Sequence, residues 1–154
     1  MIKLLVMDVD GTLTDGKIYM GSSGEVMKAF DVKDGYAIAH MLPEMGIIPV
    51  IITGRKSVIV ENRARELGIK ELHQGTPDKL ETLKEIARKY DIFPNEIAYI
   101  GDDLNDLDCI EFVGCSACPA DAADAVKREV DYVCQHPGGQ GALREMAERL
   151  QREG

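Results

Sequence analysis

The fold is decided by one stretch near the start of the sequence, Ile2-Lys3-Leu4-Leu5-Val6-Met7-Asp8-Val9-Asp10-Gly11-Thr12. Its apolar part, residues 2–9, runs almost without interruption and predicts a strand buried on both faces. The pair Asp10-Gly11 is a turn signal that ends this strand. The first element of the chain is therefore expected to lie inside a covered sheet, with polar residues directly at its carboxyl end.

The rest of the sequence alternates short apolar runs with amphipathic segments. Strands separated by helices of about 10–15 residues are typical of βαβ units, so we predict an α/β fold with a doubly wound parallel sheet and helices on both faces. A β-hairpin is expected where residues 17–20 and 25–30 flank the turn-rich segment 21–24. Further strands are expected at 47–52, 71–73, 97–100, 115–117 and 132–134, and helices at 34–45, 56–67, 77–90, 104–112, 122–128 and after Gly141.

Length and charge restrict the class of protein. The 154 residues suit one domain, residues 1–154, and the hydrophobic fraction of 45% argues against disorder. The net charge of −9 would repel nucleic acid and anionic membranes, so neither is an expected partner. A phosphorylated substrate would be repelled as well unless a cation neutralised it, so phosphate chemistry here should need a metal. A cytoplasmic protein is expected, because the chain shows no membrane-spanning run and leads directly into a strand rather than a signal peptide.

The four cysteines, Cys109, Cys115, Cys118 and Cys134, do not form the paired motifs of a zinc site. Only one Cys-x-x-Cys pair occurs, and it lies in an apolar stretch. We expect buried structural thiols.

In doubly wound sheets, ligands bind beyond the carboxyl ends of the strands, where the strand order reverses. Three such ends are polar here: Asp8 to Thr12, Thr53 to Arg55, and Gly101 to Asp103. Residues two apart at a strand end point to the same side, so Asp8 and Asp10 would repel each other without a cation or proton. Carboxylate oxygens without histidine or cysteine nearby favour Mg²⁺. Turn and helix caps explain either acidic motif alone, but explain their combination poorly.

Two further residues could bind a phosphate. Thr53 closes an apolar run and precedes Gly54, so its hydroxyl and the following N–H groups could face an anion, although an ordinary helix cap would look the same. Lys79 stands at the start of a predicted helix, where a cation opposes the helix dipole. That position indicates that Lys79 belongs to a binding site. The alternative is an ordinary solvated lysine on the surface.

Taken in order, these motifs resemble the haloacid dehalogenase superfamily of phosphatases, which has a Rossmann-like fold. The resemblance implies that Asp8 attacks phosphorus and forms an aspartyl-phosphate. It implies that Asp10 protonates the leaving alkoxide and then activates the hydrolytic water. The motifs that carry the resemblance are D-x-D-G-T at 8–12, Thr53, Lys79 and G-D-D-x-x-D at 101–106.

The same resemblance implies which residues hold the metal and which bind the phosphoryl group. Mg²⁺ would be held by the Asp8 carboxylate, the backbone carbonyl of Asp10 and Asp102. Asp103 and Asp106 would support the metal site. Thr53 and Lys79 would bind the transferring phosphoryl group.

No separate cap domain fits, because the hairpin, two helices and two strands already use the residues between Asp10 and Lys79. A finer resemblance is to a capless subgroup, the 3-deoxy-octulosonate 8-phosphate phosphatases and their relatives that act on nine-carbon sugar-acid phosphates. It implies a homotetramer assembled through the hairpins, whose exposed apolar side chains would be Ile18, Met20, Val26 and Phe30. The matching segments are residues 15–16, 30–35, 53–57, 62–64, 73–75 and 138–145.

Substrate selection is expected to come from basic residues. A sugar acid carries a carboxylate far from its phosphate, and Arg55 and Arg63 can share a helix face and bind it. Arg55 matches the form associated with the eight-carbon acid, while an ion pair with a nearby glutamate is an equal alternative for Arg63. Lys33 lies in a matching segment. Arg144 follows the glycine-rich segment 136–141, which could close over a site or merely connect the last strand to a surface helix.

Other classes stay open on the sequence alone. A phosphotransferase or a protein-phosphate phosphatase could use the same core. A receiver-like signalling domain is disfavoured because Asp10 would shorten the life of its phospho-aspartate. A regulatory module associated with a cytidylyltransferase is opposed by the completeness of the motifs.

Overall fold

The computed structural model describes residues 1–154 and contains one six-stranded sheet in which every neighbouring pair of strands is parallel. The chain starts at a central strand, extends the sheet to one side and then returns to extend it on the other. This reversal confirms the predicted doubly wound sheet. The strand order is β5 (Glu71–His73), β4 (Ile48–Ile52), β1 (Leu4–Met7), β6 (Ile97–Ile100), β7 (Cys115–Cys118) and β8 (Tyr132–Val133).

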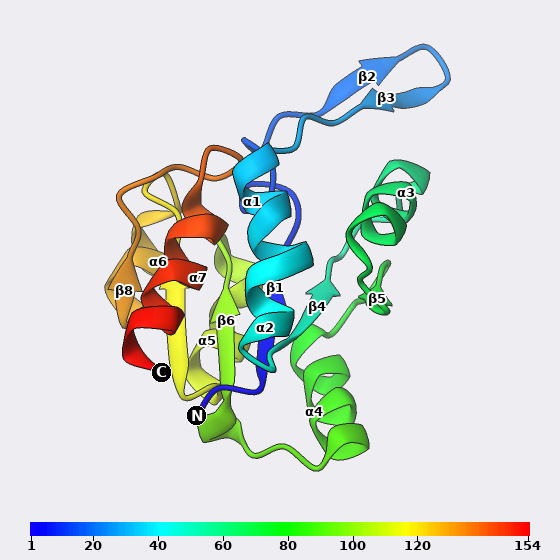
Figure 1. The fold of residues 1–154 in the computed structure, drawn as a ribbon. Coiled ribbons are helices and arrows are strands. Elements are labelled where there is room, and N and C mark those ends of the chain that lie inside the picture. Colours follow the sequence, from blue (N-terminus) through cyan, green and yellow to red (C-terminus); the bar gives the residue numbers. More distant parts are fainter.

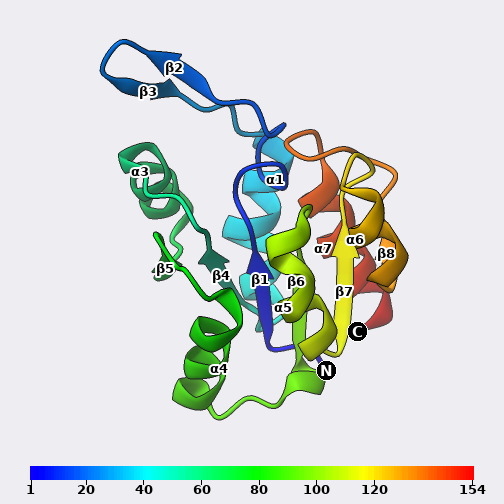
Figure 2. The same cartoon turned by 180° about the vertical axis from the view of Figure 1, so that it is seen from behind.

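Helices cover both faces of the sheet. Figure 1 shows α1, α2 and α7 over one face, and Figure 2 shows α4 and α5 over the other. The helices are α1 (Val32–Tyr36), α2 (Leu42–Glu44), α3 (Val58–Leu67), α4 (Lys79–Tyr90), α5 (Leu107–Phe112), α6 (Asp124–Glu129) and α7 (Ala142–Glu153), with 3₁₀ turns at Pro94–Glu96 and Leu104–Asp106. No helix is both long and apolar enough to cross a membrane.

The alternation of side chains along the strands divides the core in two. In β1, Leu5 and Met7 pack into the cluster beneath α7, while Leu4 and Val6 pack into the cluster beneath α4. All four are fully buried. Strands covered on both faces need apolar residues at every position, which explains the uninterrupted run in the sequence.

The predicted helix 34–45 begins earlier and is not uniform. Asp31 caps it by accepting a hydrogen bond from the Lys33 N–H, so α1 starts at Val32. A π-helical turn spans Ala37–Met41. Pro43 has no N–H to complete the ordinary ladder, which favours such a widened turn just before it.

The hairpin of β2 (Tyr19–Gly21) and β3 (Gly24–Met27) projects away from the sheet (Figure 1). Its exposed apolar side chains are Ile18, Met20, Val26 and Met27. The expectation that Phe30 is exposed with them is wrong. Phe30 is half-buried against the core beside the Arg63 guanidinium, because the chain has already returned to the body of the protein there.

All four cysteines are free thiols, and all except the half-buried Cys115 are buried. Cys115 and Cys118 lie at the two ends of β7, and their side chains pack against opposite core clusters. Residues three apart in a strand point to opposite faces, so this pair cannot converge on a shared ligand.

Candidate active site

Three polar strand ends converge at the point where the strand order reverses. Asp8 follows β1, which lies between β4 and β6 in the sheet. Thr53 follows β4 and Asp102 lies just beyond β6. Asp8 and Thr53 are 6% and 2% exposed, although both are polar. The sheet itself therefore brings these three predicted residues to one edge.

Lys79 joins this group from the first turn of α4. Its ammonium nitrogen lies 3.1 Å from Asp8 Oδ1 and 2.9 Å from Asp106 Oδ1. Asp78 caps the helix by accepting a hydrogen bond from the Glu81 N–H, so the lysine itself is not needed for capping. A buried lysine at a helix start is unfavourable on its own, and the two carboxylates offset that cost.

Asp106 fixes the position of Lys79 and of the turn after β6. Its Oδ2 accepts hydrogen bonds from the backbone N–H groups of Asp102 and Asp103, at 3.0 and 3.1 Å. Its Oδ1 accepts from Lys79 and from the Tyr99 hydroxyl. Four donors occupy the usual acceptor capacity of a carboxylate, so Asp106 acts as a brace. Gly101 permits this contact, because a Cβ there would lie 2.4 Å from the Asp106 Cγ.

Tyr99 is a site residue that the sequence reasoning missed. It is fully buried, and its hydroxyl reaches the carboxylate that holds Lys79. The only signal was one aromatic hydroxyl in an otherwise aliphatic strand. A buried tyrosine hydroxyl needs a partner, and here the partner belongs to the site.

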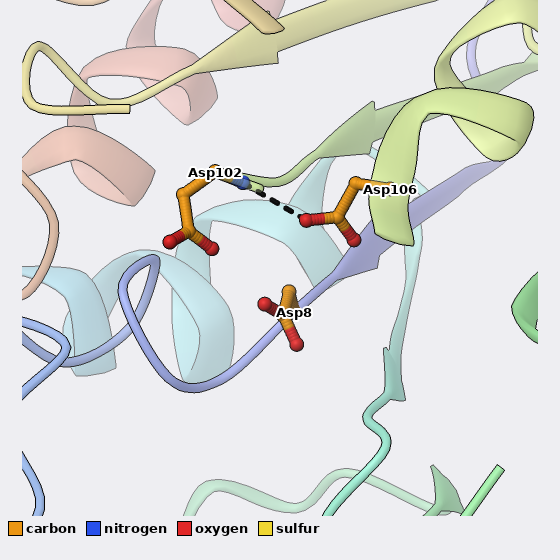
Figure 3. Close-up of side chains that lie close together, drawn as sticks. All are labelled: Asp8, Asp102 and Asp106. Carbon is orange, nitrogen blue, oxygen red and sulfur yellow. Dashed lines mark hydrogen bonds between the residues drawn. The ribbon is translucent and has the colours of Figure 1, made fainter. Parts of the chain in front are cut away.

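Asp102 is held against the loop after β1. Its Oδ1 accepts a hydrogen bond of 3.1 Å from the Thr12 hydroxyl. Gly11 has φ +91°, and a Cβ at that position would lie 1.9 Å from Asp102 Oδ2. Figure 3 shows Asp8, Asp102 and Asp106 converging from the ends of β1 and β6 and the turn that follows β6. The glycine of the first motif is therefore required for the close approach of the second.

The electrostatics of the cluster leave an excess of negative charge. One oxygen from each of Asp8, Asp102 and Asp106 lies within 4.8 Å of the others, and only Lys79 compensates them. Burial, followed by repulsion from Asp106, raises the pKa of Asp8. Burial and the neighbouring Asp8 raise the pKa of Asp102 to about 8. An all-oxygen donor set with surplus charge fits a hard divalent cation such as Mg²⁺.

Asp10 and Asp103 lie apart from this cluster. Asp10 Oδ1 lies 2.6 Å from the Lys28 ammonium, and its Oδ2 lies 3.9 Å from Arg55 Nε. Asp103 is exposed and caps the following turn by accepting a hydrogen bond from the Leu104 N–H. The structure thus joins Asp8, Lys79, Asp102 and Asp106, with Thr53 at the adjacent strand end, and leaves the side chains of Asp10 and Asp103 outside this cluster.

The four basic residues predicted for the substrate occupy different places. Arg55 is half-exposed above Asp10 and Glu25. Arg63 pairs with Glu66 on its own helix. Lys33 is exposed in the first turn of α1. Arg144 pairs with Glu148 and lies over the Tyr36 ring, 5.7 Å from its centroid.

The glycine-rich segment before α7 is packed against the loop that follows Asp10. A Cβ at Gly138 would lie 1.9 Å from the Gly11 carbonyl oxygen, and a Cβ at Gly139 would lie 2.6 Å from the Thr14 carbonyl carbon. The Gly139 N–H donates to the Thr12 carbonyl. The glycines therefore allow a close backbone approach within the same chain, to the loop that follows β1.

Comparison with known proteins agrees with this geometry. Residues 68–146 match the family model of the haloacid dehalogenase-like hydrolases. The 3-deoxy-D-manno-octulosonate 8-phosphate phosphatase of Escherichia coli is 47% identical over 97% of this chain and 79% of its own length.

Solved structures of relatives superpose closely. The same phosphatase from Moraxella catarrhalis, in complex with magnesium, phosphate and 3-deoxy-D-manno-octulosonate (KDO), has a TM-score of 0.94 and 42% identity, over 98% of this chain and 86% of that one. The cobalt-bound Haemophilus influenzae enzyme has a TM-score of 0.94 and 38% identity, over 98% and 88%. The chain belongs to the haloacid dehalogenase-like hydrolases, in the family of the 3-deoxy-D-manno-octulosonate 8-phosphate phosphatases.

Proposed function

We propose that this chain is a Mg²⁺-dependent phosphatase that hydrolyses 3-deoxy-D-manno-octulosonate 8-phosphate through an aspartyl-phosphate on Asp8. The observation that carries the proposal is the bridge from Lys79 to Asp8 and Asp106 beside Asp102, at the switch point of the sheet. The substrate class is supported by the 47% identity to the 3-deoxy-D-manno-octulosonate 8-phosphate phosphatase of Escherichia coli.

The residues divide the work by position. Asp8 is the nucleophile, and the Lys79 ammonium at 3.1 Å is placed to offset the repulsion between an anionic carboxylate and an anionic phosphate. Thr53 lies on the neighbouring strand end and binds the transferring phosphoryl group. Asp10 donates a proton to the leaving alkoxide and then accepts one from the attacking water.

The donor set fits Mg²⁺. Asp8 and Asp102 supply carboxylate oxygens, and the Asp10 carbonyl accepts no hydrogen bond within the chain and is available as a third ligand. Asp106, already saturated by four donors, and Asp103 support the turn that carries Asp102. When bound, Mg²⁺ supplies positive charge that offsets the phosphate's negative charge.

Selection of the sugar acid and the assembly are the finer parts of the proposal. Without a cap, the open site gains its remaining walls from neighbouring subunits in a homotetramer, which would bury the exposed apolar side chains of the hairpin. Arg55, Arg63, Lys33 and Arg144 are the candidates for the substrate carboxylate and hydroxyls. A cytoplasmic location and the absence of nucleic-acid and membrane partners stay predictions.

Steady-state kinetics with the eight-carbon 8-phosphate and a nine-carbon sugar-acid 9-phosphate test this function. We expect Mg²⁺-dependent turnover that EDTA abolishes, with kcat/KM at least about tenfold higher for the eight-carbon ester. Arg55→Glu should narrow that preference, whereas Lys70→Glu, the same charge change on the exposed surface just before β5, should not. A preference for the nine-carbon ester would overturn the assigned substrate.

The proposed homotetramer is tested by light scattering, which should give the mass of four chains. A monomer that still distinguishes the two substrates would overturn the proposed assembly.

A further inference from the structure

Lys28 connects the hairpin to the site. It follows β3 immediately, and its ammonium lies 2.6 Å from Asp10 Oδ1 and 2.8 Å from Glu25 Oε2. Its side chain is only 1% exposed. Lysine is rarely covered so completely, and a covered ammonium is tolerated only when it is paired. Two carboxylates meet that requirement here.

The second carboxylate is itself anchored to the body of the protein. Glu25 accepts a hydrogen bond of 2.8 Å from the Ser57 hydroxyl at the start of α3. The Ser57 N–H in turn donates a hydrogen bond of 2.9 Å to the Gln74 side-chain oxygen Oε1. The ammonium of Lys28 is therefore held from two sides and has little freedom to move away from Asp10.

The two oxygens of Asp10 have different surroundings. Oδ1 is bound to Lys28, whereas Oδ2 lies 3.9 Å from Arg55 Nε, beyond hydrogen-bonding distance. Oδ2 accepts no hydrogen bond within the chain. One oxygen is thus fixed and the other is available to a reacting group.

We propose that Lys28 is a positioning residue, which holds Asp10 by one oxygen so that the other faces the leaving oxygen of the substrate. This inference rests on the proposed phosphatase function. It makes proton transfer depend on the base of the hairpin, although Lys28 does not contact the Asp8, Lys79 and Asp102 cluster that performs attack on phosphorus.

The test compares two phosphate monoesters that differ in their need for a proton. An alkyl phosphate, such as the sugar-acid substrate, releases a basic alkoxide, whereas p-nitrophenyl phosphate releases a stable anion. The parameter is kcat/KM, which reports the steps up to departure of the leaving group. We expect Lys28→Met to lower it about 10- to 100-fold for the alkyl ester and less than about threefold for the aryl ester.

The same variant should slow the second half of the reaction, in which Asp10 acts as a base. A pre-steady-state burst of p-nitrophenol, close to one equivalent per site, should therefore appear in Lys28→Met. Lys28→Arg keeps the charge and should restore most of the activity on the alkyl ester. Lys17→Met removes an exposed lysine on the other arm of the hairpin and should change neither ester.

Glu25→Gln weakens the second support of Lys28 without altering Asp10, and should give a smaller loss with the same preference for the aryl ester. This variant decides the question if Lys28→Met does not fold. Equal losses on both esters would overturn the inference, because they would show that Lys28 only maintains the hairpin. A wild-type protein that hydrolyses neither ester with Mg²⁺ would overturn the proposed function itself.

Discussion

Two buried carboxylate clusters in this protein have opposite electrostatic character. Glu71, in the edge strand β5, meets only donors: Lys89 at 2.6 Å, His73 at 3.0 Å and the Tyr90 hydroxyl. Burial would raise its pKa, but these partners outweigh burial and lower the pKa to about 2. At the ends of β1 and β6, Asp102 meets Asp8 instead, and its pKa rises to about 8.

The difference lies in what each carboxylate meets within the chain. Glu71 is satisfied by its own chain and stabilises the fold. The Asp8 cluster places three carboxyl groups around the single ammonium of Lys79, an arrangement that disfavours the folded protein alone and that a bound cation would relieve.

The largest expected effect is on catalysis. Asp8→Asn should lower kcat by at least about 10⁴-fold, because an amide cannot attack phosphorus and also weakens the metal site. Glu71→Gln removes a comparable buried charge and should leave kcat within about threefold. Steady-state assays with saturating Mg²⁺ measure both. Full turnover by Asp8→Asn in the presence of EDTA would refute the assigned chemistry.

The second prediction concerns stability and Mg²⁺. Wild type should gain about 2.7 kcal/mol of unfolding free energy when Mg²⁺ is present at 100 times its Kd. Asp102→Asn should raise the metal-free stability, because the Asp102 carboxyl, with its pKa raised to about 8, must bind a proton or face Asp8 as an anion in the folded protein. The variant should also lose most of the gain from Mg²⁺. Thermal or urea unfolding with and without Mg²⁺ measures this. An Asp102→Asn protein that is less stable without metal would contradict the assigned repulsion.

Substitution of Glu71 should change stability in the opposite direction from substitution of Asp102. The folded Glu71 pKa of about 2 lies below its ordinary value of 4.5, so its contribution is present above pH 4.5 and is lost as pH falls toward 2. Glu71→Gln should cost on the order of 2 kcal/mol at neutral pH, with or without Mg²⁺. Urea unfolding from pH 7 to pH 3 should show the difference from wild type shrinking in acid. A difference independent of pH would show that packing, not charge, is responsible.

Asp34 is intermediate between Glu71 and Asp102 in its hydrogen bonding, and its substitution should have the smallest effect. One oxygen accepts from the Arg144 N–H at the start of α7, while the other has no partner within the chain, and burial raises its pKa to about 6. The folded state therefore binds this proton more tightly, and the contribution to stability falls as pH rises from 4 through 6. Asp34→Asn should keep the helix cap and gain about 1 kcal/mol at pH 7. The stability difference between Asp34→Asn and wild type should be larger at pH 7 than at pH 5. A difference that is the same at both pH values would contradict this.

Much of the fold and of the central site could be predicted from local patterns. An apolar run of residues predicts a strand, and parallel strands end at one edge, so Asp8, Thr53 and Asp102 could be expected together before any contact was known. Lys79 could be suspected because it opposes the dipole of its own helix. These inferences needed only periodicity and the topology of a doubly wound sheet.

The residues that were missed depend on contacts distant in sequence. Tyr99 contacts Asp106, and Lys28 reaches Asp10 only because the hairpin returns its base to the loop that follows β1. Phe30 packs against the core beside the guanidinium of Arg63, a residue of α3. No pattern within a single element encodes these pairs, so sequence periodicity could not reveal them.

Trapping the phosphoryl group is the direct test of covalent phosphoryl transfer at the Asp8 cluster. Asp10→Asn should slow hydrolysis of the intermediate, so rapid quenching of this variant with substrate and Mg²⁺ allows its peptides to be examined by mass spectrometry. We expect one phosphoryl group on Asp8, and none when Mg²⁺ is removed. Phosphate on another residue, or substrate turnover by Asp10→Asn with no phosphorylated peptide at any quench time, would contradict it.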